Sequence, residues 1–238
     1  PEETKVYYGG LVLQPFARRT GNLFRELSFG ADYFRFKQDS LISSLTAAQI
    51  LNNLTAFGNL VDRNPPAPGE TVGPISGVRT SFQNLTEGEY EGYDFNIRWI
   101  LPQRELGEFR VELSATYLKN LDFTNATGAN VDNDGGYSFP HLRSTATLAW
   151  KRKEWAASLF VNHVGHYLDN FGIARVSKQI VLNPQVAYRG FWNSTITVGV
   201  RNALDQRPPR DLSDSKLVNE NVNYVEPAFW YLRWSKEW

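Results

Sequence analysis

The chain has 238 residues, with 25 Lys and Arg against 25 Asp and Glu, and this zero net charge gives no electrostatic drive toward nucleic acid or an anionic surface. The absence of cysteine excludes a disulfide framework, a CxxC redox centre and thiolate metal sites. Mean hydropathy is −0.41, and no apolar run approaches the roughly 18 residues that a membrane-spanning helix needs.

Alternation of apolar and polar residues dominates the chain and predicts β-strands. In "YDFNIRWIL" (93–101), for example, Tyr93, Phe95 and Ile97 alternate with Asp94 and other polar residues. A short helix, "TAAQILNNL" (46–54), is expected inside the first long connection. Nine strands are predicted, in chain order, at 4–14, 25–37, 93–101, 109–118, 141–151, 154–167, 178–189, 194–202 and 224–238.

Two strands depart from this simple pattern. Pro184 falls on the apolar face of strand 178–189, where it removes a ladder donor, so a β-bulge is expected there. Strand 4–14 does not reveal which of its faces is apolar.

The connections alternate in length, and consecutive turns of an up-and-down meander lie at opposite edges of the sheet. All short connections therefore share one edge and all long ones the other, which is typical of outer-membrane barrels with short periplasmic turns and long external loops. The short connections are 102–107, 151–154 and 189–193, and the long ones are 38–80, 119–140, 168–177 and 203–223.

Aromatic residues gather near the predicted short-turn edge. Amphipathic rings are most stable where hydrocarbon meets headgroups, so this distribution predicts a membrane-interface girdle. Tyr33, Tyr117 and Tyr167 would form the opposite belt. The girdle residues are Trp99, Trp150, Trp155, Tyr188, Trp192, Trp230, Trp234 and Trp238.

The alternative all-β fold is a soluble β-sandwich that acts as a binding module, with these aromatics in its core. That fold leaves the one-sided distribution of long loops unexplained. The sequence therefore favours an all-β, antiparallel, up-and-down transmembrane β-barrel.

No catalytic constellation is found, so the chain is not expected to be an enzyme, and no cofactor or metal site is predicted. His163 and His166 resemble a metal-binding pair, but a spacing of three places them on opposite faces of a strand. The segment "VDNDGG" (131–136) resembles the start of a calcium loop and lacks the remaining ligands at EF-hand spacing. It is interpreted as a solvated turn.

Nine strands are too few for a complete barrel, because bacterial single-chain barrels have even strand numbers and an open edge in lipid leaves backbone groups without partners. The chain also contains no methionine. We therefore expect a fragment, with an odd number of further strands upstream.

The segment "GVRNALDQRPPRD" (199–211) resembles the penultimate-strand motif of TonB-dependent outer-membrane receptors. "PEETKVYYGGLVLQP" (1–15) and "EGYDFNIRWILP" (91–102) are similar to other strands of that family, and the resemblance covers the whole chain. The matching positions of the first motif are Gly199, Asn202, Leu204, Asp205, Pro208 and Pro209.

The resemblance implies that residues 1–238 are the C-terminal part of a larger, 22-stranded barrel domain that lacks its N-terminal plug and first strands. It implies a receptor in the outer membrane of a Gram-negative bacterium that takes up a scarce small-molecule nutrient, most simply a siderophore–metal complex, with energy from TonB. The implied partners are outer-membrane lipid, the TonB complex through the missing part, and the barrel-assembly machinery through Trp238, but not nucleic acid. A passive porin or another outer-membrane barrel remains the main alternative function.

Candidate substrate-binding residues are chosen only because they lie in the predicted external loops. They are Phe57, Arg63, Asn64, Asp132, Asp134, Tyr137, His166 and Arg210.

Overall fold

The computed structural model describes residues 2–18, 23–24, 26–44, 47–80, 82–124, 130–132 and 135–236. Its elements are almost entirely strands, with two short helices and one 3-10 turn near the first long connection. In chain order they are β1 (Glu3–Leu13), β2 (Glu26–Ser44), α1 (Ala47–Asn52), α2 (Leu54–Phe57), η1 (Gly58–Leu60), β3 (Val61–Arg63), β4 (Ile75–Val78), β5 (Phe82–Arg104), β6 (Gly107–Thr124), β7 (Asn130–Asp132), β8 (Leu142–Arg152), β9 (Trp155–Val164), β10 (Tyr167–Leu168), β11 (Arg175–Val176), β12 (Gln179–Phe191), β13 (Ser194–Arg201) and β14 (Phe229–Lys236).

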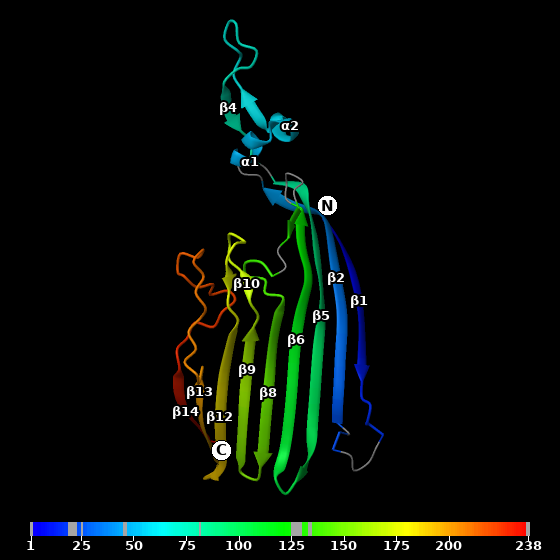
Figure 1. Cartoon of the computed structure of the whole chain (residues 1–238), viewed down its shortest axis with the longest axis vertical. Coiled ribbons are helices and arrows are strands. Elements are labelled where there is room, and N and C mark those ends of the chain that lie inside the picture. The colour runs from blue at the N-terminus through cyan, green and yellow to red at the C-terminus, as the bar shows by residue number, and fades with distance from the viewer. Residues whose placement is uncertain are drawn as a thin grey trace. The chain divides into compact units, whose positions relative to one another are not determined.

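One large sheet contains the nine predicted strands (Figure 1). Its strands follow the order β1-β2-β5-β6-β8-β9-β12-β13-β14, and the short β7 pairs with β6 as a tenth member. Along this path each strand pairs with the one that comes before it in the chain, if the short strands between them are left aside. This order confirms the predicted up-and-down meander. The sheet is not closed in this chain, because β1 and β14 stand at the two ends of the path.

The strand registers confirm that the apolar positions of neighbouring strands share one face. Trp155 is opposite Tyr188, Tyr188 is opposite Ile196, and Ile196 is opposite Trp234. Because directly paired residues point to the same side of a sheet, this row forms one apolar stripe across four strands. Similar rows repeat along the strands and alternate with polar rows on the other face.

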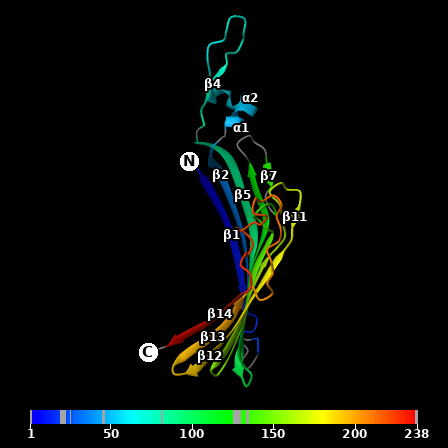
Figure 2. The same cartoon turned by 90° about the vertical axis from the view of Figure 1, so that its left-hand side faces the viewer.

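The two kinds of connection lie at opposite edges, as predicted. The β12–β13 turn is the two-residue pair Trp192–Asn193, with φ of 48° and 53°, which matches the type I′ geometry that suits a twisted hairpin. Lys153, with φ of 50°, stands in the equally short β8–β9 turn. The long connections that follow β6, β9 and β13 share the other edge. In the side view, β12, β13 and β14 fan out to one side, so this part of the sheet twists (Figure 2).

Two predicted features need correction. Strands β2, β5 and β6 have 19, 23 and 18 residues, so the connections after β2 and β6 are shorter than predicted. Pro184 causes no bulge, since its pairing with Leu159 is in an unbroken register from Gln179 to Tyr188. The irregularity lies between Arg189 and Phe191 instead.

The chain divides into two compact units, and β1, β2, β5 and β6 contribute residues to both. The first unit contains residues 1–7, 35–90 and 120–133. Its segment 47–80 has a small core of Ile50, Phe57 and Leu60, against which Val61 and Val78 pack. Helix α1 confirms the helix expected at 46–54.

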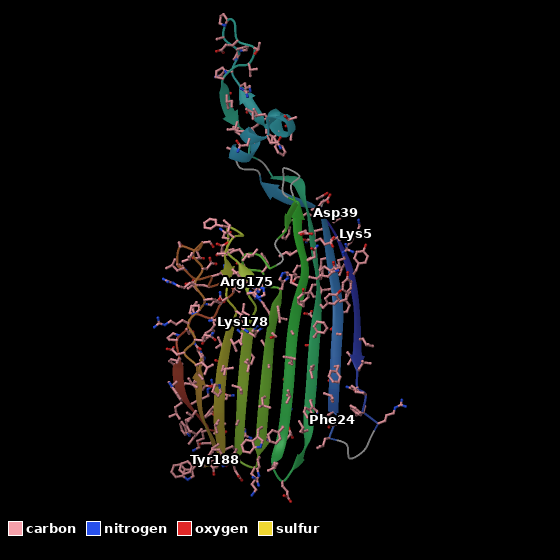
Figure 3. The ribbon with its side chains drawn as sticks, in the orientation of Figure 1. Lys5, Phe24, Asp39, Arg175, Lys178 and Tyr188 are labelled. Atoms are coloured by element: carbon pink, nitrogen blue, oxygen red, sulfur yellow. The ribbon has the colours of Figure 1, made fainter. Side chains whose placement is uncertain are left out.

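A hydrogen bond and an ion pair of side chains also connect elements of the first unit. Arg63 donates to the Gly73 carbonyl at 3.0 Å and so ties the end of β3 to the segment that leads into β4. Lys5 and Asp39 form an ion pair at 3.2 Å between β1 and β2 (Figure 3).

The second unit contains residues 8–34, 91–119 and 134–238. Its buried cluster consists of Val164, Tyr167, Val176 and Val222, which come from the long connections and the adjoining end of β9. In the described residues no second large sheet exists to cover the apolar face, so the β-sandwich alternative does not fit. No helix among the described residues is long and apolar enough to cross a membrane.

Candidate functional site

Several of the predicted girdle residues make contacts at the short-turn edge of the second unit, whereas Trp230 lies toward the other end of β14, opposite Val200. Trp155 packs on Tyr188 with ring centroids 4.8 Å apart, and Trp99 stacks on Phe24 at 5.2 Å. The indole of Trp150 donates to the Leu106 carbonyl in the β5–β6 turn at 2.7 Å. Phe24 and Tyr188 lie at this end of the ribbon in Figure 3.

The apolar face continues, uncovered, onto the last strand. Trp230, Leu232 and Trp234 are 72%, 73% and 64% exposed. Trp192 is exposed in its turn and stacks on Phe191, while Trp238 lies outside the described residues. Water-soluble monomers rarely expose a contiguous apolar surface that continues across several strands.

The predicted opposite belt needs one correction. Tyr33 packs on Tyr93 at 5.6 Å, and Tyr117 stacks on His141 at 6.0 Å. Tyr167 was wrongly placed in this belt, because its side chain is fully buried. Strand β9 ends at Val164, so the alternation that placed Tyr167 at the interface no longer applies to it.

Three long connections fold together at the opposite edge and form what we call the loop cluster, residues 135–141, 165–178 and 202–228. Side-chain hydrogen bonds join them: Asn219 donates to Ser138 Oγ at 2.8 Å, and Tyr137 donates to Asp214 Oδ2 at 2.9 Å. The third connection joins through the backbone N–H of Asn170, which donates to Ser213 Oγ at 2.8 Å.

Tyr167 stands at the centre of the loop cluster. Its hydroxyl accepts a hydrogen bond from Asn223 Nδ2 at 2.7 Å, and its ring is part of the buried cluster that includes Val176 and Val222. Burial raises the pKa of Tyr167 to about 12, and the negative charge of Asp211 adds to the rise. The phenol is therefore neutral at any physiological pH.

Asn202 anchors the longest connection of the cluster at both of its ends. Its side chain donates to the carbonyls of Gln206 and Glu226, both at 3.0 Å, and accepts the Gln206 N–H at 2.9 Å. Its φ of 50° lies in the left-handed region, which asparagine tolerates better than most residues. Asp205 adds a second tie by accepting the N–H of Ala228 at 2.9 Å.

Gly199 makes room for Tyr231 on the polar face of the sheet. A Cβ at Gly199 would lie 2.4 Å from the Tyr231 hydroxyl oxygen, so only glycine allows this ring to lie over the strand. From there Tyr231 donates to Gln185 at 2.9 Å, and Gln185 donates to Ser158 at 2.9 Å. The family motif thus contributes packing and loop anchoring, while Leu204 is exposed and Pro208 and Pro209 are half-buried.

The structure places the predicted ligand residues in different surroundings. In the loop cluster, His166 and Arg210 are exposed, while Tyr137 is half-buried. Partial burial and the positive charge of Arg175 lower the pKa of His166. Arg175 and Lys178 stand near the same edge in Figure 3.

The remaining candidates lie in the first unit or outside the described residues. Arg63 and Asn64 are exposed at the β3–β4 hairpin, whereas Phe57 is buried in the small core and offers little surface to a ligand. Asp132 is described only by its backbone in β7, and Asp134 lies outside the described residues.

Sequence reasoning missed Asn202, Asp211 and Asn223 as structural centres of the loop cluster. The high density of Asn and Asp between 202 and 223 is the signal that could have revealed them, because these side chains satisfy irregular backbone. Among the described residues, no group of three His, Cys, Asp or Glu side chains is arranged to hold a metal.

No protein-family model matches the chain, and no curated protein sequence matches it. Solved structures do. The ferric enterobactin receptor PfeA of Pseudomonas aeruginosa matches 98% of this chain with a TM-score of 0.61 at 16% identity, over 30% of its own length. The copper transporter OprC matches 97% with a TM-score of 0.52 at 16% identity, also over 30% of its length.

A third structure is the ferripyoverdine receptor of the outer membrane of Pseudomonas aeruginosa, which matches 96% of this chain with a TM-score of 0.56 at 14% identity, over 26% of its own length. The chain thus spans less than a third of each of these proteins. Its fold is therefore that of part of the transmembrane β-barrel of TonB-dependent outer-membrane receptors, the family that its sequence motifs resemble.

Proposed function

We propose that this chain is the C-terminal part of a TonB-dependent receptor that takes up a scarce nutrient across the outer membrane of a Gram-negative bacterium. The observation that carries the proposal is the open nine-strand meander, whose apolar face is uncovered and whose long loops share one edge. Further strands of the same protein would close this sheet, because an open strand edge in lipid leaves its backbone groups unpaired.

The apolar face is the lipid-facing surface in this proposal, and the polar face lines the barrel interior. Trp155, Tyr188 and Trp234 then stand at the periplasmic interface, where indole and phenol groups can reach water. The loop cluster faces the outside, and its exposed residues His166 and Arg210 are the strongest candidates for contact with the nutrient. The barrel-assembly machinery would recognise the C-terminal segment that includes Trp238.

A siderophore–metal complex is the proposed substrate, supported by the fold shared with ferric enterobactin and ferripyoverdine receptors. The fold is also shared with a copper transporter, so copper is the comparison in the test. No group on the polar face or in the loop cluster is assigned a catalytic role. The receptor proposal therefore involves no chemical change to the nutrient.

Uptake measurements in cells test this function. Cells that lack the gene are compared with complemented cells for accumulation of a radiolabelled iron–siderophore panel and of copper, each with and without a functional TonB. Saturable uptake of one iron complex that needs both the gene and TonB supports the proposal. Uptake that persists without TonB would instead identify a passive porin.

Variants in the loop cluster then test the binding residues. His166→Ala and Arg210→Ala are expected to raise the concentration for half-maximal uptake while the receptor level in the membrane stays unchanged. Lys216→Ala serves as a control, because that lysine is exposed in the same cluster and pairs only with the surface residue Glu220 among the described groups. Equal uptake in all three variants would remove these two residues from the site.

A further inference from the structure

A hollow of about 420 Å³ lies on the polar face of the sheet, over the neighbouring strands β9, β12, β13 and β14 (Figure 1). This volume falls in the range of small-molecule binding sites. The last part of the loop cluster, at Tyr224 and Glu226, closes one side of the hollow. The hollow combines three aromatic rings with polar side chains, and the residues that matter below are Phe160, Tyr224, Tyr231, Asn183, Arg201 and Glu226.

The strand registers bring the residues of the wall to one place. Phe160 is directly opposite Asn183. Two positions further along β12, Gln185 is opposite Gly199, and Gly199 is opposite Tyr231. Because residues two positions apart on a strand point to the same side, these two rows are neighbours on one face.

The rings are unexpected on this face, which is otherwise polar. Phe160 and Trp155 are an odd number of positions apart on β9, so their side chains point to opposite faces, and contact with lipid does not explain Phe160. Phe160 is nevertheless 40% exposed. Tyr231 is held over Gly199 by its hydrogen bond to Gln185 at 2.9 Å. Rings fixed on a polar wall offer apolar planes to a ligand.

The polar groups of the hollow keep hydrogen-bonding capacity. Asn183 Oδ1 accepts the backbone N–H of Asn202 at 2.8 Å, which leaves Asn183 Nδ2 without a partner among the described residues. Tyr224 donates to Glu226 Oε2 at 2.6 Å, and Arg201 Nη1 lies 3.7 Å from the same oxygen. The other carboxylate oxygen of Glu226 can therefore accept from a ligand, and the remaining N–H groups of Arg201 can donate to it.

Charge and polarity together define the class of ligand. Arg201 and Glu226 are the charged residues of the lining, and they pair, so a polyanionic metal chelate gains no net attraction here. A purely apolar ligand would displace water from the polar groups and leave them unpaired, which costs free energy. A hydroxyl group can both donate and accept. A neutral ring with hydroxyls around its edge and C–H groups on its face satisfies both kinds of lining.

We propose that this hollow binds a neutral sugar ring, with the C–H face on Phe160 and the hydroxyls bonded to Asn183, Arg201 and Glu226. Two sources carry this chemistry, a free neutral oligosaccharide and a sugar substituent on a metal chelate, and the test separates them. The inference rests on the proposed receptor function, since that function makes the polar face the interior wall of the barrel. It adds an interior binding site to the external contacts at His166 and Arg210.

Sugar binding is measured on the whole protein that contains this chain, purified in a detergent without a sugar headgroup. The probes are maltotetraose, cellotetraose, and an iron–catecholate complex with and without glucose substituents. Calorimetry measures the Kd, and saturation-transfer NMR reports which sugar protons contact the protein. We expect saturable binding of a tetrasaccharide or of the glucosylated complex alone, with the strongest transfer at ring C–H protons. The first result identifies a free oligosaccharide as the source, and the second a sugar substituent.

Variants place the sugar in the hollow. Phe160→Leu keeps an apolar side chain and removes the flat ring, so the Kd should rise about tenfold. Glu226→Gln keeps the size and replaces a charged acceptor, so a rise of at least about tenfold is expected. Phe160→Tyr keeps the ring and should retain binding, which separates loss of the contact from loss of the fold.

A second hollow on the polar face supplies a matched control. It has a volume of about 450 Å³ and contains the pair of Arg98 and Glu112 at 3.5 Å, but no aromatic ring among its described lining residues. Glu112→Gln should therefore leave the Kd for the sugar unchanged.

Three results would overturn the proposal. The first is the absence of saturable binding of every sugar-bearing probe, which would mean that another segment of the protein or water alone fills the hollow. The second is equal affinity for the iron complex with and without glucose while neither tetrasaccharide binds. The third is an unchanged Kd in both Phe160→Leu and Glu226→Gln. Uptake in cells that does not need TonB changes none of these measurements, and failure of sugar binding leaves TonB-dependent uptake of another nutrient intact, so the two proposals fail independently.

Discussion

Replacement of Asn202 by alanine should open the longest connection of the loop cluster without unfolding the sheet. The side chain is fully buried and makes three hydrogen bonds with the backbone of Gln206 and Glu226. Each bond contributes about 1 kcal/mol, so their loss costs about 3 kcal/mol. Alanine at a φ of 50° adds about 1 kcal/mol of backbone strain. Asn202→Ala should therefore destabilise the closed connection by about 4 kcal/mol.

Hydrogen exchange measures this local opening directly, because exchange of protected amides reports the free energy of opening. The informative amides are those of Ala203, which donates to Leu182, and Ala228, which donates to Asp205. A cost of about 4 kcal/mol predicts exchange about 10³-fold faster at these positions, since each 1.4 kcal/mol is a factor of ten. Amides in the β8–β9 ladder, such as that of Leu159, should not change.

Asn202→Gly separates the two contributions. Glycine adopts a positive φ without strain but makes no side-chain bond, so exchange should rise only about 10²-fold. If glycine restores wild-type protection, strain and not hydrogen bonding explains the alanine effect. If neither variant changes the exchange of Ala203 and Ala228, the assignment of Asn202 as the anchor is wrong.

Three further predictions follow from single contacts. Gly199→Ala should displace the Tyr231 ring and destabilise the protein by about 1–3 kcal/mol in urea unfolding, and the loss should shrink when Tyr231→Ala is added. Val198→Arg, on the proposed lipid face, should cost about 2–4 kcal/mol in vesicles, whereas Thr197→Arg, on the polar face of the same strand, should cost little, and the reverse order would refute the assignment of the faces. Tyr167 has a higher pKa in the folded protein, about 12, than in the unfolded chain, about 10, so the folded state favours the neutral phenol. The contribution of the neutral phenol to stability is complete below about pH 10 and is lost as the pH rises toward about 12. Hydrogen exchange of the loop-cluster amides should therefore accelerate over that pH range in the wild type. In Tyr167→Phe, which lacks the phenol, this contribution to the acceleration should be absent.

The sequence predicts the strands well because their determinant is local. Most long strands of the sheet present an apolar residue at nearly every second position, as β13 does with Val198 and Val200, and this alternation can be recognised without knowledge of the neighbouring strands. The ends of the longer strands were not predicted, because the apolar–polar alternation stops several residues before the strand itself ends. In β2, the charged residues Arg35 and Lys37 replace apolar ones, and both pair with Glu89 of β5. The ladder continues where the apolar signal has ended.

The loop cluster could not be predicted in the same way because its contacts join distant parts of the chain. Tyr167 is buried by Val176 and Val222, and the second of these lies 55 positions later in the sequence. No local pattern separates such a residue from an interfacial tyrosine. Similarly, the resemblance identified Asn202 as a motif position, but its role depends on Glu226 at the far end of the connection.

The sheet and the loop cluster satisfy their backbone groups by different means, and under the proposed receptor function this difference bears on where a nutrient would bind. In the sheet, the ladder pairs backbone groups whatever the side chains are, so the sequence is free to alternate. Most of the loop cluster, apart from the short β10–β11 pair, forms no strand ladder. There, side chains such as Asn202, Asp205 and Asp211 accept hydrogen bonds from the backbone instead. These residues are therefore committed to holding the loops. Under the proposed receptor function, substrate specificity would come from exposed neighbours such as His166 and Arg210, which can change without loss of the loop structure.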